Sequence, residues 1–282
     1  FYKNKNFIKV MKKNHLLSTN DVINTNNCHI SVCKTKYKNK LIILSVIDNL
    51  IKGGSGQAIQ NMNINGNAVV PIPEVKKFFM RNLDFHWPHH AAVSFSNLAL
   101  VGINSWVSVY FIRIHGWSLS EAGLYIGISL ILGGLIGLVG GGWLSDKLSV
   151  RFVGGKAIFC IMCALLAVPF AALFTLTDSP FAALIFFGLS YGFMVAPIPS
   201  AAAMLQETTP NRMRGTLSAF YLLIISIIGL ALGPLIVASL NDIFFDGDTG
   251  IRQALLIAIP SFNLIAAFLY FKLLKPYKAR CS

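Results

Sequence analysis

The chain has 282 residues, of which 55% are hydrophobic, and its formal net charge at pH 7 is +13. Charge-free apolar runs fill most of residues 91–271, which excludes most soluble enzymes as the role of that part. Residues 1–81 hold 13 lysines and arginines against three acids, whereas residues 82–282 hold 11 against eight. The composition therefore predicts two differently built segments. Their boundary lies near residues 65–73, where Gly and Pro punctuate the sequence as in a linker.

The first segment, residues 1–66, has the pattern of a small and incomplete α/β unit. The stretches NNCHISVC and KLIILSVID alternate or run apolar like β-strands. A turn containing Gly53, Gly54 and Gly56 then leads into helix-like sequence. A glycine turn before a helix can hold a phosphate, but the G-x-G-x-x-G pattern is incomplete, and a structural turn explains it equally.

Neither the lysines nor the cysteines form a recognisable binding pattern. The lysines of the first segment are scattered without interleaved aromatic residues, which argues against a nucleic-acid partner. Cys28 and Cys33 lack a second ligand pair for zinc. Cys160 and Cys163 lie within an apolar stretch, where they fit buried small residues. We therefore expect no disulfide framework and no metal site.

The stretch VIDNLIKGGSGQAIQNMN closely resembles the C-terminal end of the N-acetyl-gamma-glutamyl-phosphate reductases, which are NADP-dependent enzymes of arginine biosynthesis. The resemblance covers about residues 1–64. It implies that the helix after Asp48 belongs to a dinucleotide-binding domain, with Gly53, Gly56, Gln57 and Asn61 near the cofactor. In that family the catalytic cysteine and most of the nucleotide fold lie upstream. The resemblance thus implies no enzyme activity and no cofactor in this chain, and NADP only for a complete reductase.

The second segment contains six apolar stretches of about 18–25 residues, each long enough to cross a bilayer core as a helix. No charged side chain lies inside any of them. They are Ala91–Ile112, Ala122–Leu144, Ala157–Leu176, Phe181–Leu205, Thr216–Leu240 and Ala254–Phe271. The predicted fold is an all-α membrane bundle of six transmembrane helices.

The links between these stretches alternate in charge. Twelve lysines and arginines fall on one side: Lys76, Lys77, Arg81, Lys147, Arg151, Lys156, Arg212, Arg214, Lys272, Lys275, Lys278 and Arg280. The other side has only Arg113 and Arg252, together with five acids. Because basic links stay in the cytoplasm, we expect an integral protein of the inner or plasma membrane with both termini cytoplasmic.

Glycines and prolines within the stretches indicate how the helices pack. The second stretch carries Gly123 and Gly127, then Gly133, Gly137 and Gly141, at four-residue spacing, and the fifth carries Gly229 and Gly233. Small residues at this spacing let helix backbones approach closely in lipid. A flexing role in a moving helix explains the same glycines. Prolines within the stretches predict kinks.

The sequence GGWLSDKLSVR follows the second stretch and places an acid and two bases at its basic end. Asp146 gains nothing from the helix dipole there, so it is expected to pair with Lys147, Arg151 or a base on a neighbouring helix. Such a charge cluster can latch two helices in one conformation. A solvated interfacial link is the alternative.

The same stretch resembles the cytoplasmic loop motif of the major facilitator superfamily, G-x-L-x-D-[RK]-x-G-R-[RK]. Gly142, Leu144, Asp146, Lys147 and Arg151 match it, whereas Ser149 and Val150 depart from it. A later passage, TTPNRMRGTLSAFYLLIISIIGLALGP, resembles the family's tenth-to-eleventh helix region. The resemblance covers about residues 74–276. Within the superfamily, the sequence most resembles the spinster-like and organic-anion-transporter branches.

The resemblance implies the second half of a transporter built from two six-helix bundles that rock about a central site. A lone bundle cannot form both walls of the pathway, so a complementary N-terminal six-helix half is expected as a partner. The predicted organisation is a reductase-like tail at 1–66, a linker and interfacial segment at 67–90, the half-bundle at 91–276 and a cytoplasmic tail at 277–282.

Polar groups inside the stretches are candidates for a substrate cavity, because such groups tend to face a bundle interior or a cavity. Asn97 and Asn104 lie on one helical face, and the resemblance places their stretch at the central cavity. With Tyr191 and Tyr221 they are the predicted lining; helix–helix hydrogen bonding is the alternative. His86, His89 and His90 are expected at the membrane edge, with Trp87 as an interfacial anchor.

Two main hypotheses follow. The first is a transmembrane transporter that moves a small organic solute by alternating access, with the lipid bilayer, the solute and a first half as partners. The second is a fragment of an NADP-dependent reductase fused to membrane sequence and inactive as given. A membrane subunit without transport activity is a third possibility.

Overall fold

The computed structural model describes residues 8–23, 25, 27–35, 41–47, 70–245 and 249–281. The chain divides into two compact units, Phe1–Val70 and Pro71–Ser282. Each unit is considered by itself below. The expected glycine turn and helix with Gly53, Gly56, Gln57 and Asn61 lie outside the described residues.

The first unit is a small three-stranded sheet. Its strands are β1 (Ile8–Val10), β2 (Cys28–Lys34) and β3 (Leu41–Ile47), in the order β1-β2-β3. β1 pairs with β2 in parallel, and β2 pairs with β3 antiparallel. The short helix η1 (Thr19–Asp21) is held by a capping box between Ser18 and Asp21. The alternating sequence therefore predicted β2 and β3, whereas the three-residue β1 is too short to leave a pattern.

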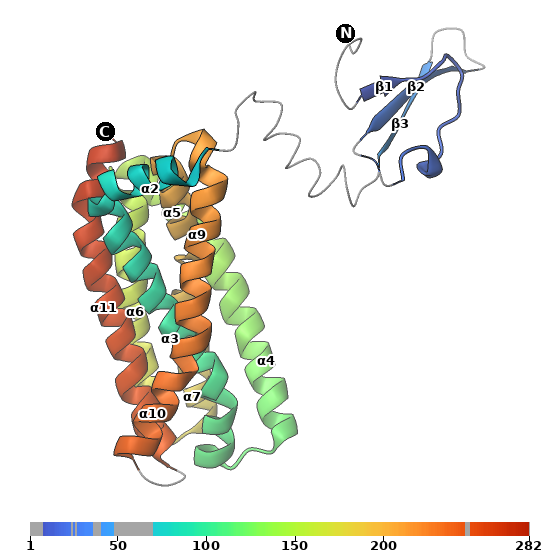
Figure 1. Cartoon of the computed structure of the whole chain (residues 1–282). Coiled ribbons are helices and arrows are strands. Elements are labelled where there is room, and N and C mark those ends of the chain that lie inside the picture. The colour runs from blue at the N-terminus through green and yellow to red at the C-terminus, as the bar shows by residue number, and fades with distance from the viewer. Residues whose placement is uncertain are drawn as a thin grey trace. The chain divides into compact units, whose positions relative to one another are not determined.

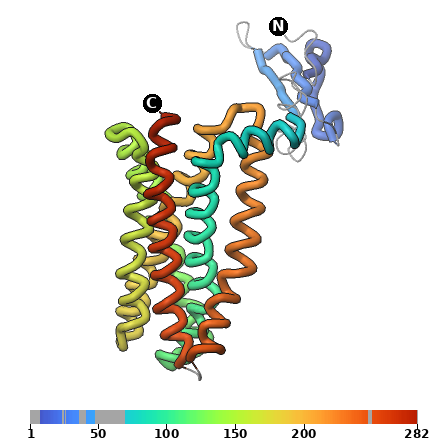
Figure 2. The backbone as a smooth tube through the Cα atoms, turned by 60° about the vertical axis from the view of Figure 1, so that its left-hand side comes forward, coloured from blue at the N-terminus to red at the C-terminus, as the bar shows by residue number. Residues whose placement is uncertain are grey.

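The second unit is a bundle of long helices with one short helix lying across an end (Figures 1 and 2). Within the described residues, six segments are long and apolar enough to cross a membrane. The bounds are α2 Ile72–Arg81, α3 Leu83–His115, α4 Leu119–Leu135, η3 Ile136–Gly140, α5 Gly141–Arg151, α6 Gly155–Leu176, α7 Pro180–Val195, α8 Ile198–Thr208, η4 Asn211–Met213, α9 Arg214–Ser226, η5 Ile227–Leu232, α10 Gly233–Phe244 and α11 Gly250–Cys281. The predicted fold class, a six-helix membrane bundle beside a small α/β-type segment, is confirmed.

Local sequence signals set the helix ends. Gly116 ends α3 in the left-handed region at φ 68°, where a residue with a side chain is strained. Ser118 and Glu121 then form a capping box that begins α4. Gly154, at φ 81°, makes the turn before α6. These caps satisfy backbone groups that a helix end otherwise leaves without partners.

Two helices are longer than the sequence predicted. α3 begins at Leu83, so part of the expected interfacial segment is the start of the first span. α11 continues to Cys281, so the expected cytoplasmic tail is mostly helix. Charged residues ended the predicted apolar stretches, but hydrogen bonding along the helix continues past them.

The core lies along α3, α6 and α11. Tyr110, Phe174 and Tyr270 are among its largest fully buried side chains. In α11, 56% of the most apolar 18-residue stretch is buried inside the bundle, whereas the value is only 17% in the α4–α5 span and 22% in the α9–α10 span. The bundle therefore has a central set of three helices, and two spans with largely uncovered surfaces.

Small residues bring the α4–α5 span against α7. A methyl group added at Gly133 would lie 2.6 Å from the carbonyl oxygen of Gly188, and one at Gly141 would lie 2.7 Å from the side chain of Ala196. Between them, a methyl group at Gly137 would collide with the backbone of Gly192. The three contacts repeat every four residues on both helices, as expected for close packing in lipid.

A second close approach joins the α9–α10 span to α3. A methyl group at Gly233 would lie 3.1 Å from the carbonyl oxygen of Leu98, and one at Gly229 would collide with the side chain of Asn97. Glycine contacts thus contribute to the packing of both uncovered spans against the bundle.

Both spans also contain a π-helical segment near their middle. η3 separates α4 from α5, and η5 separates α9 from α10. Pro234, just after η5, cannot donate a backbone hydrogen bond to the preceding turn. Such single-turn irregularities are frequent at functional sites in helices.

The glycine contacts yield a matched pair of variants within η3. Gly137→Ala should lower the free energy of unfolding by about 1–3 kcal/mol, because the added methyl group overpacks the contact with Gly192. Gly140→Ala should be neutral or slightly stabilising, since nothing lies within 4 Å of its new methyl group. Thermal unfolding in detergent, followed by circular dichroism, measures both. Equal unfolding temperatures for the two variants would contradict the close approach.

Candidate functional site

Polar side chains of α3 hydrogen-bond to the α9–α10 span. The Asn97 side-chain amide donates to the carbonyl oxygen of Ile225 at 2.7 Å. The Trp106 indole donates to the carbonyl oxygen of Pro234 at 3.1 Å. The two acceptors flank η5, so α3 supplies donors on both sides of the irregular segment.

Asn104 lies on the same face of α3 as Asn97 but is exposed. It follows Asn97 by seven residues, which is two helical turns. It lies 11 residues from the end of α3 at His115, or about 16 Å along the axis, well within a bilayer core. Its side chain makes no hydrogen bond within the described residues, whereas the neighbouring Ser105 hydroxyl donates to Val101 at 2.9 Å. Asn104 is therefore free to bind a polar group at this depth.

The structure does not gather the four predicted cavity residues at one point. Asn97 and Asn104 share a face of α3. Tyr191 lies on α7, where its ring is 6.1 Å from that of Phe187. Tyr221 is buried on α9 next to the histidines at the start of α3. The cavity assignment of these residues remains a prediction.

An apolar groove of about 490 Å³ runs between the α4–α5 span and α7. Its floor is formed by the glycine contacts, and its walls are nearly all hydrocarbon. The lining side chains include Tyr125, Ile128, Ser129, Leu132, Ile136, Leu184, Leu189 and Phe193. A groove of this composition suits an apolar group.

The three histidines of the HWPHH sequence pack against other helices, and their expected place at the membrane edge stays a prediction. His86, His89 and His90 are buried, with 1%, 0% and 5% of their surfaces exposed. Trp87, between them, is 64% exposed. The difference arises because α3 begins at Leu83 and turns the three rings inward, under α2 and against α8 and α9.

The loop motif forms a helix that continues its span. Gly142, Asp146, Lys147 and Arg151 all lie in α5. Asp146 is exposed and makes no ion pair within the described residues. Lys147 lies 5.0 Å above the Trp143 ring, and Arg151 lies 5.6 Å from the Phe152 ring. The expected pairing of Asp146 with a base is thus not formed in this chain by itself.

Polar contacts join the helices at the basic end, by which we mean the end that holds α2, the α5–α6 link, η4 and the last turns of α11. Glu207 of α8 pairs with Lys156 of α6 and accepts a hydrogen bond from the Tyr277 hydroxyl of α11 at 2.6 Å. Arg280 binds both carboxylate oxygens of Asp84, at 2.7 and 3.0 Å. These contacts tie α3, α6, α8 and α11 together.

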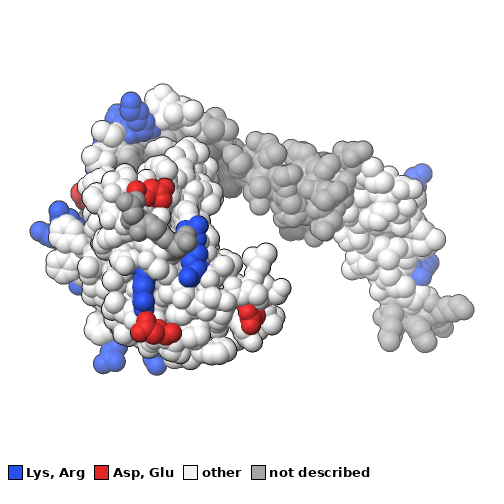
Figure 3. All heavy atoms as spheres, turned by 90° about the horizontal axis from the view of Figure 1, so that it is seen from below, with Lys and Arg blue, Asp and Glu red and all other residues white. Residues whose placement is uncertain are grey.

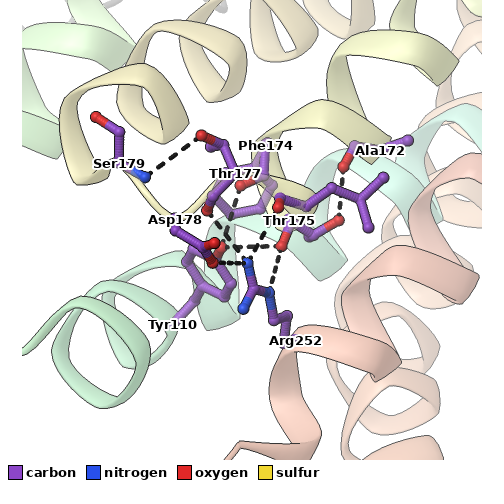
Figure 4. A network of polar contacts seen from close by, with 9 residues as sticks. Tyr110, Ala172, Phe174, Thr175, Thr177, Asp178, Ser179 and Arg252 are labelled. Carbon is purple, nitrogen blue, oxygen red and sulfur yellow. Dashed lines mark hydrogen bonds and ion pairs between the residues drawn. The ribbon is translucent and has the colours of Figure 1, made fainter.

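A second network joins α3, α6 and α11 at the opposite end (Figure 4). The Arg252 guanidinium donates to the carbonyl oxygens of Thr175 at 2.6 Å, Leu176 at 3.2 Å and Thr177 at 3.3 Å. It also pairs with Asp178 at 2.8 Å. Arg252 thereby supplies donors to the last carbonyls of α6, which have no partner within their own helix. Seen from this end, acidic side chains lie beside basic ones on the surface (Figure 3).

The Tyr110 hydroxyl of α3 donates to the same helix end, at 3.1 Å from the Phe174 carbonyl oxygen. Neither Tyr110 nor Arg252 was singled out from the sequence as a binding residue. The sequence did offer a signal for Arg252. It lies at the start of the last apolar stretch, on the side of the bundle that is otherwise rich in acids.

The family follows from comparison with known proteins. The sequence model of the Major Facilitator Superfamily matches residues 52–234. The chain belongs to the major facilitator superfamily. Its fold is similar to a bacterial homolog of the human lysosomal transporter Spinster in an inward-facing, unoccupied conformation, with a TM-score of 0.63 and 20% identity. That match covers 89% of this chain and 54% of the other. The occupied form of the homolog matches at a TM-score of 0.53.

The N-terminal unit of this superfamily member is similar to a different protein. The family model for the semialdehyde dehydrogenase dimerisation domain matches residues 1–49. The N-acetyl-gamma-glutamyl-phosphate reductase of Thermoanaerobacter pseudethanolicus is 53% identical over 64 residues, which are 23% of this chain and 19% of that enzyme. The enzyme of Vesicomyosocius okutanii is 57% identical over 63 residues. The chain thus spans about a fifth of these reductases and about half of the solved transporter.

The network around Arg252 predicts a loss of stability on its removal. Arg252→Ala should lower the free energy of unfolding by about 2 kcal/mol, because the carbonyls at the end of α6 lose a charged donor. Arg212→Ala is the control, since Arg212 is exposed and makes no ion pair within the described part of the chain. Unfolding in detergent compares the two. An Arg252→Ala protein as stable as the control would refute the assignment.

The ion pair at the same end should show a pH signature. The Arg252 guanidinium holds the pKa of the Asp178 carboxyl below its ordinary value of about 3.9. A carboxyl pKa that is lower in the folded state stabilises the folded protein at pH values above the ordinary pKa. That contribution is lost as the pH falls through the pKa of the folded state. Asp178→Asn should therefore lower the unfolding temperature slightly at neutral pH and have no effect once the wild-type carboxyl is protonated. The effect is small, because Asp178 is largely exposed. A difference that persists or grows in acid would contradict the pairing.

Proposed function

We propose that the bundle is the second half of a transporter that moves a small organic solute by alternating access, with both ends of the bundle's chain in the cytosol. The family and the fold support transport. The surplus of lysine and arginine at the basic end supports the orientation, because basic links remain on the cytosolic side. A complementary six-helix half and the lipid bilayer are the partners that this proposal needs.

The observation that carries the proposal is the uncovered surface of the α4–α5 and α9–α10 spans. Only 17% and 22% of their apolar windows are buried within the bundle, less than in any of the other four spans. In the solved Spinster homolog, the matched part is 54% of the chain, so a second portion of similar size exists there. A first half packed against these two spans would enclose a pathway between two bundles.

Asn104 is the residue best placed to meet a solute on this side of the pathway. A side-chain amide facing lipid at bilayer depth would lose its hydrogen bonds to water without replacing them. Its exposure on the face of α3 next to the α9–α10 span therefore favours a position in the pathway. Tyr191 is proposed as a second lining residue. No cofactor is proposed for the chain.

A reductase function is supported only by the N-terminal match. The matched part is about a fifth of the reductases, and the resemblance implies that the catalytic cysteine belongs to the part that is not matched. We therefore infer that these 282 residues do not carry out the NADP-dependent reduction. NADPH oxidation by the purified chain, with the reductase substrate present, is the test, and measurable turnover would overturn this inference.

The transport proposal is tested by flux in proteoliposomes. The chain is reconstituted alone or co-expressed with the first six-helix half of a spinster-type relative, and uptake of a panel of labelled organic anions, amines and sugars is measured. Flux is expected only for the combined halves. Asn104→Ala should reduce it about 2–10-fold, the equivalent of one hydrogen bond.

Ser105→Ala is the matched control, because the Ser105 hydroxyl is already bonded within α3. Flux unchanged in Asn104→Ala would remove that residue from the pathway. Absence of flux for every solute with both halves present and folded would contradict the proposal itself.

A further inference from the structure

Three histidines form a compact cluster at the start of α3, which the transport proposal does not use. The ring centroids of His89 and His90 lie 5.2 Å apart, and those of His86 and His90 lie 5.6 Å apart. All three side chains are at least nine-tenths buried. Buried imidazoles without a metal or a carboxylate partner require an explanation.

The hydrogen bonds fix which ring nitrogens carry the protons. His89 Nε2 lies 2.9 Å from the carbonyl oxygen of Ala201, and His90 Nδ1 lies 2.8 Å from that of His86. A carbonyl oxygen only accepts, so each of these nitrogens donates. In the neutral rings, His89 Nδ1 and His90 Nε2 then carry a lone pair and no proton. Both are buried, and neither has a partner within the described residues.

Aromatic rings enclose the cluster and connect three helices through it. Phe79 of α2 stacks on His86 at 4.6 Å and meets the edge of His90 at 5.5 Å. Phe79 also meets Phe220 of α9 at 5.6 Å. The Tyr221 ring of α9 lies 5.7 Å from His89 and 5.9 Å from His90. Contacts with neutral rings therefore hold α2 and α9 against α3.

The charged groups nearby are already paired or turned to solvent. On α3, Asp84 is bound by Arg280 of α11. On α8, Glu207 is bound by Lys156 and Tyr277. On α6, the Cys160 thiol lies near Tyr221. On α2, the charged side chains Glu74, Lys76, Lys77 and Arg81 are all exposed. An imidazolium in the cluster would thus find no free carboxylate among these groups.

We propose that the His86–His89–His90 cluster is a proton-binding site that holds α2 and α9 against α3 when it is neutral and releases them when it is protonated. A proton from water binds the lone pair of His90 Nε2 or His89 Nδ1. The new N–H has no acceptor inside the cluster, so the charged ring is solvated only when the helices separate. Proton uptake by the cluster favours the released state below the ordinary imidazole pKa of about 6.5. For each proton taken up, a fall of one pH unit then raises the ratio of released to packed molecules by up to tenfold.

The site is tested by distances between spin labels in the full chain in lipid nanodiscs. One label is placed at Met80→Cys on α2, which is 57% exposed, and the other on the native Cys281 of α11, with Cys28 and Cys33 replaced by serine. A reference pair at Leu166→Cys and Leu264→Cys reports the α6–α11 packing. Between about pH 8 and pH 4.5, we expect a longer-distance population to appear in the first pair and no change in the reference pair.

The His89→Gln/His90→Gln double variant lacks both nitrogens at which the proton is proposed to bind and should show no pH response. His90→Phe is a second variant that fills the aromatic cluster and leaves His89 as the remaining proton-accepting ring, so it should open less than the wild type at the same acidic pH. His115→Gln, at the other end of α3, is the matched control and should respond as the wild type does. A wild-type distribution that is the same at both pH values, a double variant that still opens, or equal broadening of both label pairs would overturn the proposal. Transport is not measured, so failure here is separate from failure of the proposed function.

Discussion

The close approach of helix backbones at small residues is the contact on which this bundle depends. In lipid, burial of apolar side chains drives helix association weakly, because the acyl chains are as apolar as leucine. Gly133, Gly137 and Gly141 therefore let the α4–α5 span approach the backbone of α7, Gly233 does the same between α10 and α3, and Gly229 makes room for the Asn97 side chain of α3. In the α9–α10 span, hydrogen bonds from Asn97 and Trp106 of α3 act beside them, on either side of η5.

The rest of the bundle is held differently. α3, α6 and α11 share the buried core and are joined at both ends by charged and polar contacts, through Arg252 at one end and through Glu207 and Arg280 at the other. The ion pairs Lys156–Glu207, Arg252–Asp178 and Arg280–Asp84 involve neither α4–α5 nor α9–α10. Three helices joined by polar contacts and two glycine-packed spans are consistent with the proposal that the bundle moves against a partner. The histidine cluster lies where α9 meets these three helices.

Much of the architecture could be predicted from the sequence, because length and the absence of charge decide membrane-spanning helices with little help from tertiary structure. The four-residue spacing of Gly133, Gly137 and Gly141 likewise predicted where backbones meet, whereas Gly123 and Gly127 have the same spacing but no neighbouring helix atom within 4 Å of an added methyl group. The surroundings of Asn97, Tyr221 and the histidines could not be predicted from the sequence in the same way. Whether a polar side chain faces a cavity, a carbonyl or an aromatic ring depends on helix rotation and on where α3 begins, which is set by packing against α2, α8 and α9. Asp146 shows another limit, since pairing depends on contacts beyond its own helix.

The central claim is that these helices cross a bilayer with the basic end in the cytosol. The most direct test is labelling of single cysteines in intact cells by a membrane-impermeant maleimide, in a chain whose native cysteines are replaced. Leu119→Cys at the opposite end and Val150→Cys at the basic end are 78% and 91% exposed in the wild-type side chains, so both are accessible to reagent. The account predicts that Leu119→Cys is labelled in intact cells and Val150→Cys only after permeabilisation. The reverse pattern, or equal labelling of both, would contradict it.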